Sequence, residues 1–540
     1  MVLERSSGVL LHPTSLPGRF GIGDLGPGAR RFVDWLAAAG GQLWQVLPLG
    51  TTGDDFSPYQ ALSASAANPL LVSPELLAED GLIEDADLDE AADPPGADAA
   101  FVDFRSVAAE KDRLLRVAAA SFRRLPLAHP FRADFARFCR DHASWLDDHA
   151  MFLALREANR RRAWWEWSEL VTPERHPTAD APAELAERLE LHRITQWLLR
   201  RQWDGLRRYA RARGVRLIGD LPIYVAHDSV DVWAHRELFQ LDAAGEPTLV
   251  AGVPPDYFSA TGQLWNNPVY DWDANRRDDY RWWIARVGAL SELVDLARVD
   301  HFRGFEAFWA VPAGEPTAEN GQWHPGPGAE LFDAVRRGLS SSPPKGDGTA
   351  PLEGDGVAPL PLIAEDLGFI TPKVVELRKQ LGLPGMEVLQ FLWNYDEERF
   401  VPPDRFDRDI VVYTGTHDNN TTRGWFEEVV LHDPPMLERL RQYTRAEPDT
   451  IAWDLIGLAW HSTAAVAIAP LQDVLSLGPE ARMNKPGTRQ REHPNWSWRV
   501  SPDALTSELA ARLAALTEQT GRGRAHASPG ANEPSAADGV

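Results

Sequence analysis

Eight short apolar segments, each bounded by turn residues and separated by helical patterns, constrain the fold of this 540-residue chain most strongly. They lie at residues 8–11, 42–49, 216–225, 294–299, 360–364, 386–392, 410–413 and 464–469. Apolar runs of this length are typical of strands that are buried on both faces of a parallel sheet. Eight such strands alternating with helices favour an α/β fold of the (β/α)8 TIM-barrel class over an open sheet.

Two of the intervening helices carry clear end signals. Residues 29–39 have the amphipathic spacing of a helix, and a pair of glycines, Gly40 and Gly41, follows them. Later in the chain Thr371 is placed as an N-cap, Pro372 as the first helical residue and Gly382 as the stop. Both helices are therefore predicted between consecutive barrel strands.

The spacing of the segments predicts one catalytic domain over residues 1–500 with two large insertions. The first, at about 65–205, is mostly helical by pattern and ends in a long helix over 183–213. The second, at about 226–290, is rich in Trp, Tyr, Pro and Asp and is expected to cover the cleft. Residues 340–359 and 521–540 are rich in Gly and Pro without periodicity, so we expect a flexible linker and a disordered tail there.

Charge and cysteine content exclude several classes of partner. The net charge of −24 opposes binding to nucleic acid or to an anionic membrane surface. No apolar run approaches the roughly 18 residues of a membrane span, and the N-terminal residues do not have the pattern of a signal peptide. The single cysteine, Cys139, excludes an intramolecular disulfide and a thiolate metal cluster. We therefore expect a cytoplasmic protein without nucleic-acid or membrane partners.

Acidic residues follow four of the predicted strands, where the chemistry of a barrel of this class is found. Asp220 ends the third strand, Asp300 the fourth and Glu365 the fifth, and Asp418 follows the seventh. Clustered carboxylates repel one another, so each would lower the stability of the fold unless it is paired or used. This arrangement predicts an active site built on carboxylates.

The residues around these acids suggest a role for each. Arg298 and Asp300 are two apart on a strand and should face the same way, so the guanidinium is expected to keep Asp300 ionised as a nucleophile. Glu365, flanked by Ala364 and Leu367, is expected to hold a proton as a general acid. Two carboxyls roughly 5–5.5 Å apart would give retention of anomeric configuration. Sugar hydroxyls would be bound by Asp220, His301, His417 and Asp418.

Each assignment has a structural alternative. Asp300 could form only a structural ion pair with Arg298, and Glu365 could be a solvated acid at a strand end. His417 and Asp418 could bind a metal, although no His-x-His or His-Glu-x-x-His spacing supports that site. The chain has 21 tryptophans, and those in polar segments such as 262–266 and 495–499 could support sugar rings or could belong to the core.

Eight segments from residue 8 to about 499 together resemble the amylomaltase, or disproportionating-enzyme, family of 4-α-glucanotransferases within the α-amylase superfamily. The motifs are HPTSLPG at 12–18, SPYQ at 57–60, GDLPIY at 219–224, PPDYFSATGQLW at 254–265, RVDHFRG at 298–304, IAEDLG at 363–368, TGTHDN at 414–419 and RMN at 482–484. Their number and their common order make the resemblance specific.

The resemblance implies that Asp300 is the nucleophile, Glu365 the acid/base and Asp418 the acid that stabilises the transition state. It implies a substrate site formed by Ser57, Tyr59, Asp220, Trp265, Arg298, His301, His417 and Asn484, with no metal and no cofactor. The substrates would be maltooligosaccharides and longer α-1,4-glucans, and the acceptor a sugar hydroxyl. The alternatives are an α-glucan hydrolase with the same acids, a noncatalytic glucan-binding protein and a metal-dependent sugar isomerase.

Overall fold

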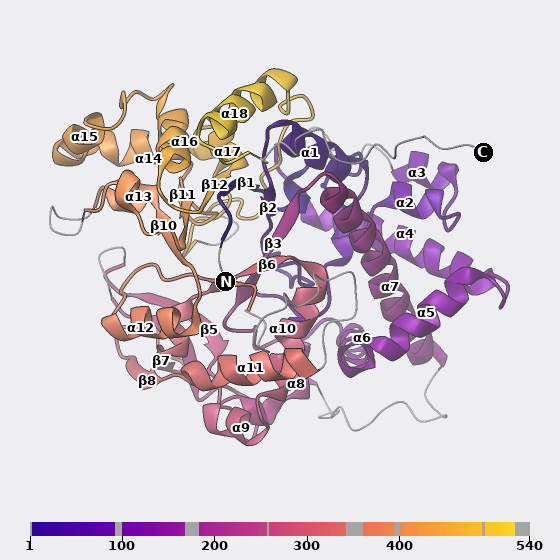
Figure 1. Ribbon diagram of the computed structural model, residues 1–540. Coiled ribbons are helices and arrows are strands. Elements are labelled where there is room, and N and C mark those ends of the chain that lie inside the picture. Colours follow the sequence, from indigo (N-terminus) through magenta and orange to yellow (C-terminus); the bar gives the residue numbers. More distant parts are fainter. Residues whose placement is uncertain are drawn as a thin grey trace, which may run out of the picture.

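The computed structural model describes residues 3–91, 100–167, 183–255, 259–341, 360–394, 400–488 and 492–523. Eight parallel strands stand side by side in chain order and form a barrel (Figure 1). They are β1 (Ser6–Leu10), β2 (Leu43–Gln45), β3 (Arg216–Pro222), β6 (Leu296–Asp300), β9 (Leu362–Ala364), β10 (Gly385–Val388), β11 (Ile410–Tyr413) and β12 (Val466–Pro470). A hydrogen bond of 2.8 Å from the Ala364 nitrogen to the Pro384 oxygen links β9 to β10. The predicted (β/α)8 fold is confirmed.

Each predicted segment overlaps a strand, and the runs at 42–49 and 386–392 extend four residues past its end. Only three residues of the run at 42–49 form β2. Pro48, later in the run, has no backbone N–H and so cannot donate to a neighbouring strand. The run at 386–392 changes structure after Val388, where the short helix α13 (Leu389–Leu392) begins. Both parts of this run are buried, and an apolar run without periodicity cannot separate a buried strand from a buried helix.

The two helices with clear end signals form as predicted. α1 (Pro27–Ala38) and α12 (Pro372–Leu381) both begin with proline, whose fixed φ suits the first helical turn. Gly382 ends α12 at φ +64°, and Gly40 follows α1 at φ +74°. At such positive φ an L side chain would be strained, which explains why glycine is found at both helix ends.

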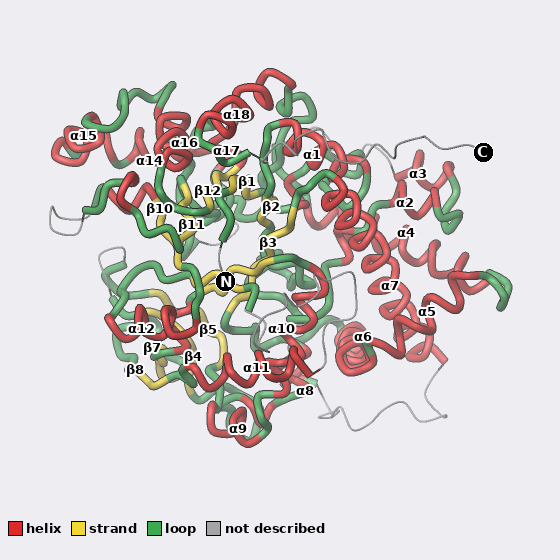
Figure 2. The backbone as a smooth tube through the Cα atoms, viewed as in Figure 1, coloured by secondary structure: helices red, strands yellow, loops and turns green. Residues whose placement is uncertain are grey.

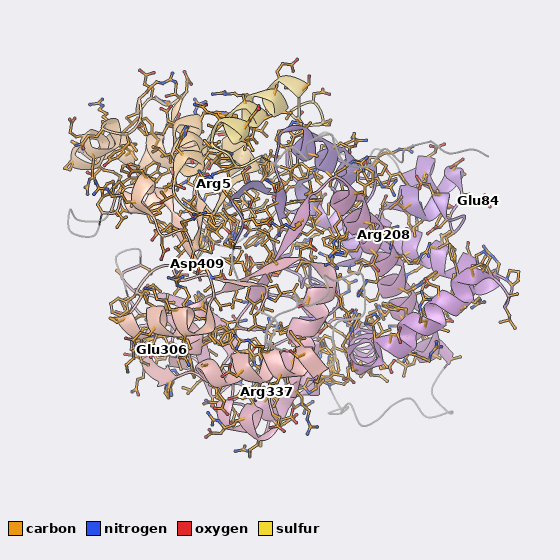
Figure 3. The ribbon with its side chains drawn as sticks, viewed as in Figure 1. Arg5, Glu84, Arg208, Glu306, Arg337 and Asp409 are labelled. Atoms are coloured by element: carbon orange, nitrogen blue, oxygen red, sulfur yellow. The ribbon has the colours of Figure 1, made fainter. Side chains whose placement is uncertain are left out.

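The segment between β2 and β3 forms a helical lobe beside the barrel (Figure 1). It contains α4 (Phe104–Arg124), α5 (Pro130–Asp141), α6 (Ala143–Ala158) and α7 (Ala183–Ala212). Trp197 of α7 packs against α4 and α5, since its ring lies 5.1–5.7 Å from those of Phe122, Phe131 and Phe135. Figure 3 shows Glu84 at the edge of this lobe, far from the barrel.

A second sheet was not predicted. It is antiparallel, in the order β5-β4-β7-β8, and contains β4 (Leu249–Val253), β5 (Gln263–Pro268), β7 (Ala307–Pro312) and β8 (Gln322–Pro325). These strands lie below the barrel in the view of Figure 2. β8 is largely exposed and β5 is only partly buried, so neither appears in the sequence as a buried apolar run.

The predicted linker and tail fall mostly outside the described residues, at 342–359 and 524–540. Their predicted starts need correction. α11 (Ala329–Ser341) includes residues 340 and 341, and Arg522 is fully buried against the barrel. The absence of hydrophobic periodicity suggested a tail from residue 521, but the guanidinium of Arg522 binds buried carbonyl groups at this end of the barrel. In the part of the chain that the structure describes, no helix is long and apolar enough to cross a membrane.

Candidate active site

Arg298 joins the carboxylates of two neighbouring strands at the C-terminal end of the barrel. Its Nε and Nη2 donate to the two carboxylate oxygens of Asp220 at 3.1 and 3.0 Å. Nη2 also donates to Asp300 Oδ1 at 2.6 Å, as predicted for residues two apart on one strand. The Asp220 and Arg298 side chains are 0% and 5% exposed, whereas Asp300 keeps 30% of its side chain exposed. Asp300 is therefore the carboxylate of this group that a substrate can reach.

Tyr59 extends the network toward the seventh strand. Its hydroxyl donates to Asp220 Oδ2 at 2.6 Å and accepts from Arg298 Nη2 at 3.3 Å. Its ring stacks on that of His417, with centroids 5.0 Å apart and an interplanar angle of 13°. Ser57 lies behind it, and its Oγ accepts from the Tyr59 nitrogen at 3.3 Å. Ser57 thus shapes the turn that presents Tyr59.

Glu365 is held by backbone donors at the end of β9. Its Oε1 accepts from the Leu367 nitrogen at 2.8 Å, and its Oε2 accepts from the His301 nitrogen at 2.7 Å. His301 directly follows Asp300 and adopts a left-handed conformation with φ +52°, which bends the chain after β6. The backbone that carries Asp300 therefore also fixes the carboxyl of Glu365.

Burial raises the pKa of both Asp300 and Glu365. Arg298 lowers the pKa of Asp300, while Asp220, Glu365 and Asp418 raise it. That Arg298 keeps Asp300 ionised stays a prediction, because the guanidinium lowers the pKa of Asp300 while burial raises it. The low dielectric and the neighbouring carboxylates favour a site that retains a proton.

Asp418 lies on the loop after β11 and is bound from several sides. Its Oδ1 accepts from Asn484 Nδ2 at 2.6 Å and lies 3.3 Å from His417 Nε2. Arg482 donates to its backbone oxygen at 2.7 Å. Burial lowers the pKa of His417 although Asp418 raises it, so the imidazole is neutral at pH 7. The Asp418 side chain is 48% exposed and open to a ligand.

Trp265 packs against His301, the residue that follows Asp300. Their rings meet edge to face, 4.8 Å apart at 86°. The Trp265 Nε1 donates to Gln263 Oε1 at 3.2 Å, which orients the indole. The His301 Nε2 is buried without a hydrogen-bond partner in the described residues, and burial lowers the pKa of His301 to about 3. A neutral imidazole with one nitrogen to satisfy is suited to bind a hydroxyl.

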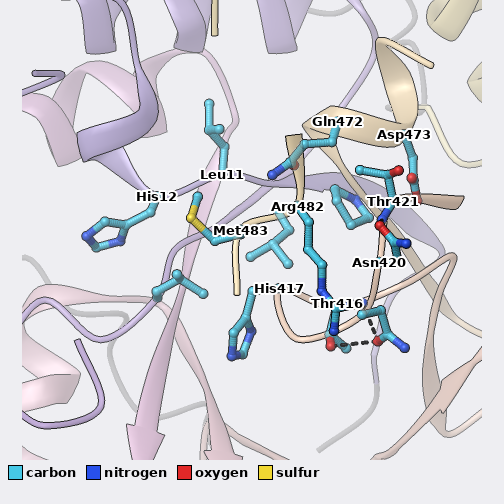
Figure 4. Close-up of a pocket in the computed structure, with 14 residues that line it drawn as sticks. Leu11, His12, Thr416, His417, Asn420, Thr421, Gln472, Asp473, Arg482 and Met483 are labelled. Carbon is cyan, nitrogen blue, oxygen red and sulfur yellow. Dashed lines mark hydrogen bonds between the residues drawn. The ribbon is translucent and has the colours of Figure 1, made fainter. Parts of the chain in front are cut away.

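Residues beyond the predicted set also belong to the site. His12, at the end of β1, lines a small cavity of about 20 Å³ with Thr416, His417 and Arg482 (Figure 4). Burial lowers the pKa of His12 to about 3. Its position after a strand, inside the motif at 12–18, could have identified it from the sequence. Trp496 is largely buried beside His417, with ring centroids 5.9 Å apart, so it supports the site by packing.

The arrangement can supply a nucleophile and a proton donor from adjacent strands. Asp300 and Glu365 end β6 and β9, which pair in parallel, and Asp418 faces the same end of the barrel. Among the described residues, no group of three or more His, Cys, Asp or Glu side chains could hold a metal ion. A carboxylate pair of this kind is suited to displacement at an anomeric carbon.

The family model described as 4-alpha-glucanotransferase matches residues 11–506 of the chain. The 4-alpha-glucanotransferase of Synechocystis sp. is 46% identical over 530 residues, which cover 97% of this chain and 99% of the relative. That of Thermus thermophilus is 44% identical over 528 residues, 97% of this chain and 100% of the relative. The structure of the amylomaltase from Streptococcus agalactiae in complex with acarbose matches with a TM-score of 0.86 at 34% identity, covering 96% of this chain and 100% of that chain. The predicted resemblance is confirmed, and the chain belongs to the 4-alpha-glucanotransferase family.

Proposed function

We propose that this chain transfers α-1,4-glucan segments between maltooligosaccharide or starch-type chains by a retaining double displacement. In the first step a carboxylate oxygen of Asp300 attacks the anomeric carbon of the donor. The glycosidic C–O bond breaks as Glu365 gives its proton to the leaving oxygen. The products are a glycosyl ester on Asp300, a shortened glucan and an ionised Glu365.

In the second step the acceptor is a sugar hydroxyl. Glu365 takes its proton while the hydroxyl oxygen attacks the anomeric carbon and displaces Asp300. A new glycosidic bond replaces the ester, and both carboxyls return to their starting states. Two inversions leave the anomeric configuration unchanged.

The contacts of Glu365 and Asp300 are the observation that carries this proposal. Arg298 contacts Asp300 at 2.6 Å, which favours the carboxylate form of Asp300. The hydrogen-bond partners of Glu365 in the described ranges are the backbone nitrogens of His301 and Leu367, and no guanidinium is among them. We therefore assign the shared proton to Glu365 rather than to Asp300. Asp300 and Glu365 together hold one proton in this mechanism. The raised pKa values of both carboxyls are consistent with a pair that shares it.

We propose that the surrounding side chains bind the sugar next to the scissile bond. Sugar hydroxyls would donate to the Asp418 carboxylate and accept from the His417 imidazole. Asn484 orients Asp418. Asp220 and Tyr59 are already joined to Arg298 and form the floor of the site. Trp265 and His301 would form a wall of the site, and Ser57 would act through Tyr59.

Maltotriose incubated with the purified protein and a chelator tests the proposal. Longer oligomers should appear together with glucose, without a matching increase in reducing ends. Glu365→Gln should lower this rate by about 10²–10⁴-fold, the usual contribution of a general acid/base. Chain-length profiles and free glucose are measured together.

Glu376→Gln is the matched control, because Glu376 is exposed on α12 and should leave the rate unchanged. Shorter products alone, with rising reducing ends, would identify a hydrolase instead. Loss of activity on adding the chelator would point to a metal-dependent reaction. We further propose that the enzyme acts in the cytoplasm, where its lone Cys139 would remain a thiol.

A further inference from the structure

A cavity of about 930 Å³ lies away from the catalytic carboxylates, and we call it the lateral groove. It is lined from α6, α8 (Val230–Ala234), α9 (Trp272–Arg277), α10 (Arg281–Leu293) and α11 (Ala329–Ser341), between the helical lobe and the lower part of the molecule in Figure 1. The cavities that touch the active-site residues measure about 20 and about 60 Å³. The lateral groove is within the size range of ligand sites.

We propose that the lateral groove is a noncatalytic binding site for a segment of α-glucan chain. The proposal rests on the proposed function, because the ligand is the polymer on which the enzyme would act. Such a site would hold a long substrate on the enzyme while another part of it reacts. It would raise the effective concentration of polymer ends at the active site.

Two tryptophans from different helices line the lateral groove. Trp145 belongs to α6 and Trp282 to α10, and both are partly buried. The ring of Trp145 lies 5.8 Å from that of His142, and Trp282 has the guanidinium of Arg286 5.1 Å from its centroid. These contacts hold the indoles in place while both still line the cavity. Rigid aromatic surfaces of this kind bind the apolar faces of pyranose rings at low cost in conformational entropy.

The charges of the lateral groove select against an anionic ligand. Three arginines line it, among them Arg277 and Arg281. They are outnumbered by six carboxylates, Asp141, Asp148, Asp231, Glu237, Asp278 and Glu292. A phosphate or a nucleotide would be repelled by this balance. A neutral ligand with many hydroxyls can instead donate to carboxylates and accept from guanidinium groups, as a glucan does.

The inner end of the lateral groove is connected to the segments that present the active site. Asp231 accepts a hydrogen bond of 2.8 Å from the nitrogen of Ala64, in the loop that carries Tyr59. Arg286 donates to the carbonyl oxygen of Pro222, the last residue of β3, at 2.5 Å. Substituting either residue would disturb catalysis directly. A test of binding therefore needs positions at the outer part of the groove.

Ala285→Trp fills the lateral groove without touching that connection. Ala285 is exposed on α10 and lines the groove, so the added ring would occupy the space of the ligand. Ala143→Trp is the matched control, since Ala143 is exposed at the start of α6 but does not line the groove. Both are made in a Glu365→Gln background, which slows turnover during the titration. Thermal unfolding checks that each variant folds.

Calorimetric titration with maltoheptaose and retardation in glycogen-containing gels measure binding. We expect two maltoheptaose sites per chain in Glu365→Gln and in its Ala143→Trp variant, and one site with Ala285→Trp. Glycogen affinity should fall by about tenfold with Ala285→Trp alone, equivalent to about 1.4 kcal/mol. One site in all three proteins, or glycogen affinity that is equal in all three, overturns the proposal.

The same variants with Glu365 restored separate this proposal from the proposed function. Maltotriose, which is too short to occupy both sites at once, should be converted equally well by Ala285→Trp and Ala143→Trp. With amylose below saturation, only Ala285→Trp should be slower. If no protein converts maltotriose, the proposed function fails, while the number of maltoheptaose sites still decides whether the groove binds glucan.

Discussion

Two buried arginines lie at opposite ends of the barrel and have opposite electrostatic surroundings. Arg298, at the C-terminal end, donates to the carboxylates of Asp220 and Asp300. Arg522, at the N-terminal end, donates to backbone carbonyl oxygens of six residues, Ser6, Ala459, Trp460, Ser462, Ala464 and Ala465. Burial acts to lower the pKa of Arg298, but its carboxylates outweigh that effect and raise it. At Arg522 burial lowers the pKa, because within the described residues it has no carboxylate partner.

The comparison shows that a buried arginine stabilises the fold at the N-terminal end of the barrel and supports the chemistry at the C-terminal end. At the N-terminal end Arg522 donates to buried carbonyl groups beside the first residues of β1 and β12, and it adds to the other donors that these groups have. Arg5, labelled in Figure 3, adds donors to Ser462, Ala464 and Thr520. At the C-terminal end Arg298 partly neutralises acids that are there for reaction. The contacts of Arg522 lower the free energy of the folded state. The carboxylates around Arg298 raise that free energy, and they are present because the reaction needs them.

Of the two arginines, Arg298 is the one whose removal should lower activity. Arg298→Gln leaves Asp220 and Asp300 without their cation, which raises the pKa of the nucleophile and disorders Tyr59. We expect kcat/KM to fall by about 10²–10³-fold, comparable to the loss of one preorganised charge-stabilising group. Steady-state kinetics with maltotriose measure this effect.

A double variant separates this activity loss from unfolding. Arg298→Gln alone should lower the free energy of unfolding by about 3–5 kcal/mol, because a buried Asp220 is left unpaired. Adding Asp220→Asn removes the buried charge and should restore much of the stability but not the activity. Wild-type activity in either variant would mean that Arg298 is only a structural ion pair.

Removing Arg522 should lower stability but leave the chemistry unchanged. Arg522→Met keeps an unbranched side chain but removes the hydrogen bonds that a charged guanidinium donates to six carbonyl groups. We expect the free energy of unfolding to fall by about 3 kcal/mol, since a hydrogen bond to a charged group contributes about 1.5–3 kcal/mol and the remaining donors compensate for part of the loss. The kcat of the folded fraction should remain that of the wild type. Chemical denaturation combined with activity below the transition measures both.

Arg208→Met is the control for this variant, because Arg208 is exposed on α7 and its loss should change stability little. Equal stability of the Arg522 and Arg208 variants would show that the contacts at the N-terminal end of the barrel contribute nothing. A fall in kcat at full folding would show that the two ends are coupled.

Neutralising Asp300 should give a small gain in stability that depends on pH. Because burial raises the folded-state pKa of Asp300 above its unfolded value, the folded form binds more protons and loses stability as pH rises through this interval. Asp300→Asn removes that loss. We expect a gain of about 1 kcal/mol near pH 8, reduced because 30% of the side chain faces water, and almost none near pH 4.

Thermal unfolding across this pH range, with the exposed Asp503→Asn as control, measures the gain. A loss of stability at pH 8 in Asp300→Asn would show that its ion pair with Arg298 stabilises the fold. The active-site end of the barrel would then resemble the N-terminal end more closely than we infer.

The barrel and the acids at its C-terminal end could be predicted from the sequence, because strand and helix patterns depend on neighbouring residues. Strand and helix patterns predicted the barrel, and the C-terminal ends of parallel strands necessarily lie at one end. This rule alone places Asp220, Asp300, Glu365 and Asp418 at one end of the barrel. The second sheet was missed because its partly exposed strands have no buried apolar run.

The sequence by itself determined which residues could carry the chemistry and on which strands they would lie. Only the tertiary structure decided how they are charged, because the pKa of Asp300 depends on burial and on carboxylates from three other segments. It also decided that Arg522, predicted to lie in a tail, is buried and binds the start of β1, 516 residues away. Such contacts depend on distance in space, and local patterns contain no information about that distance.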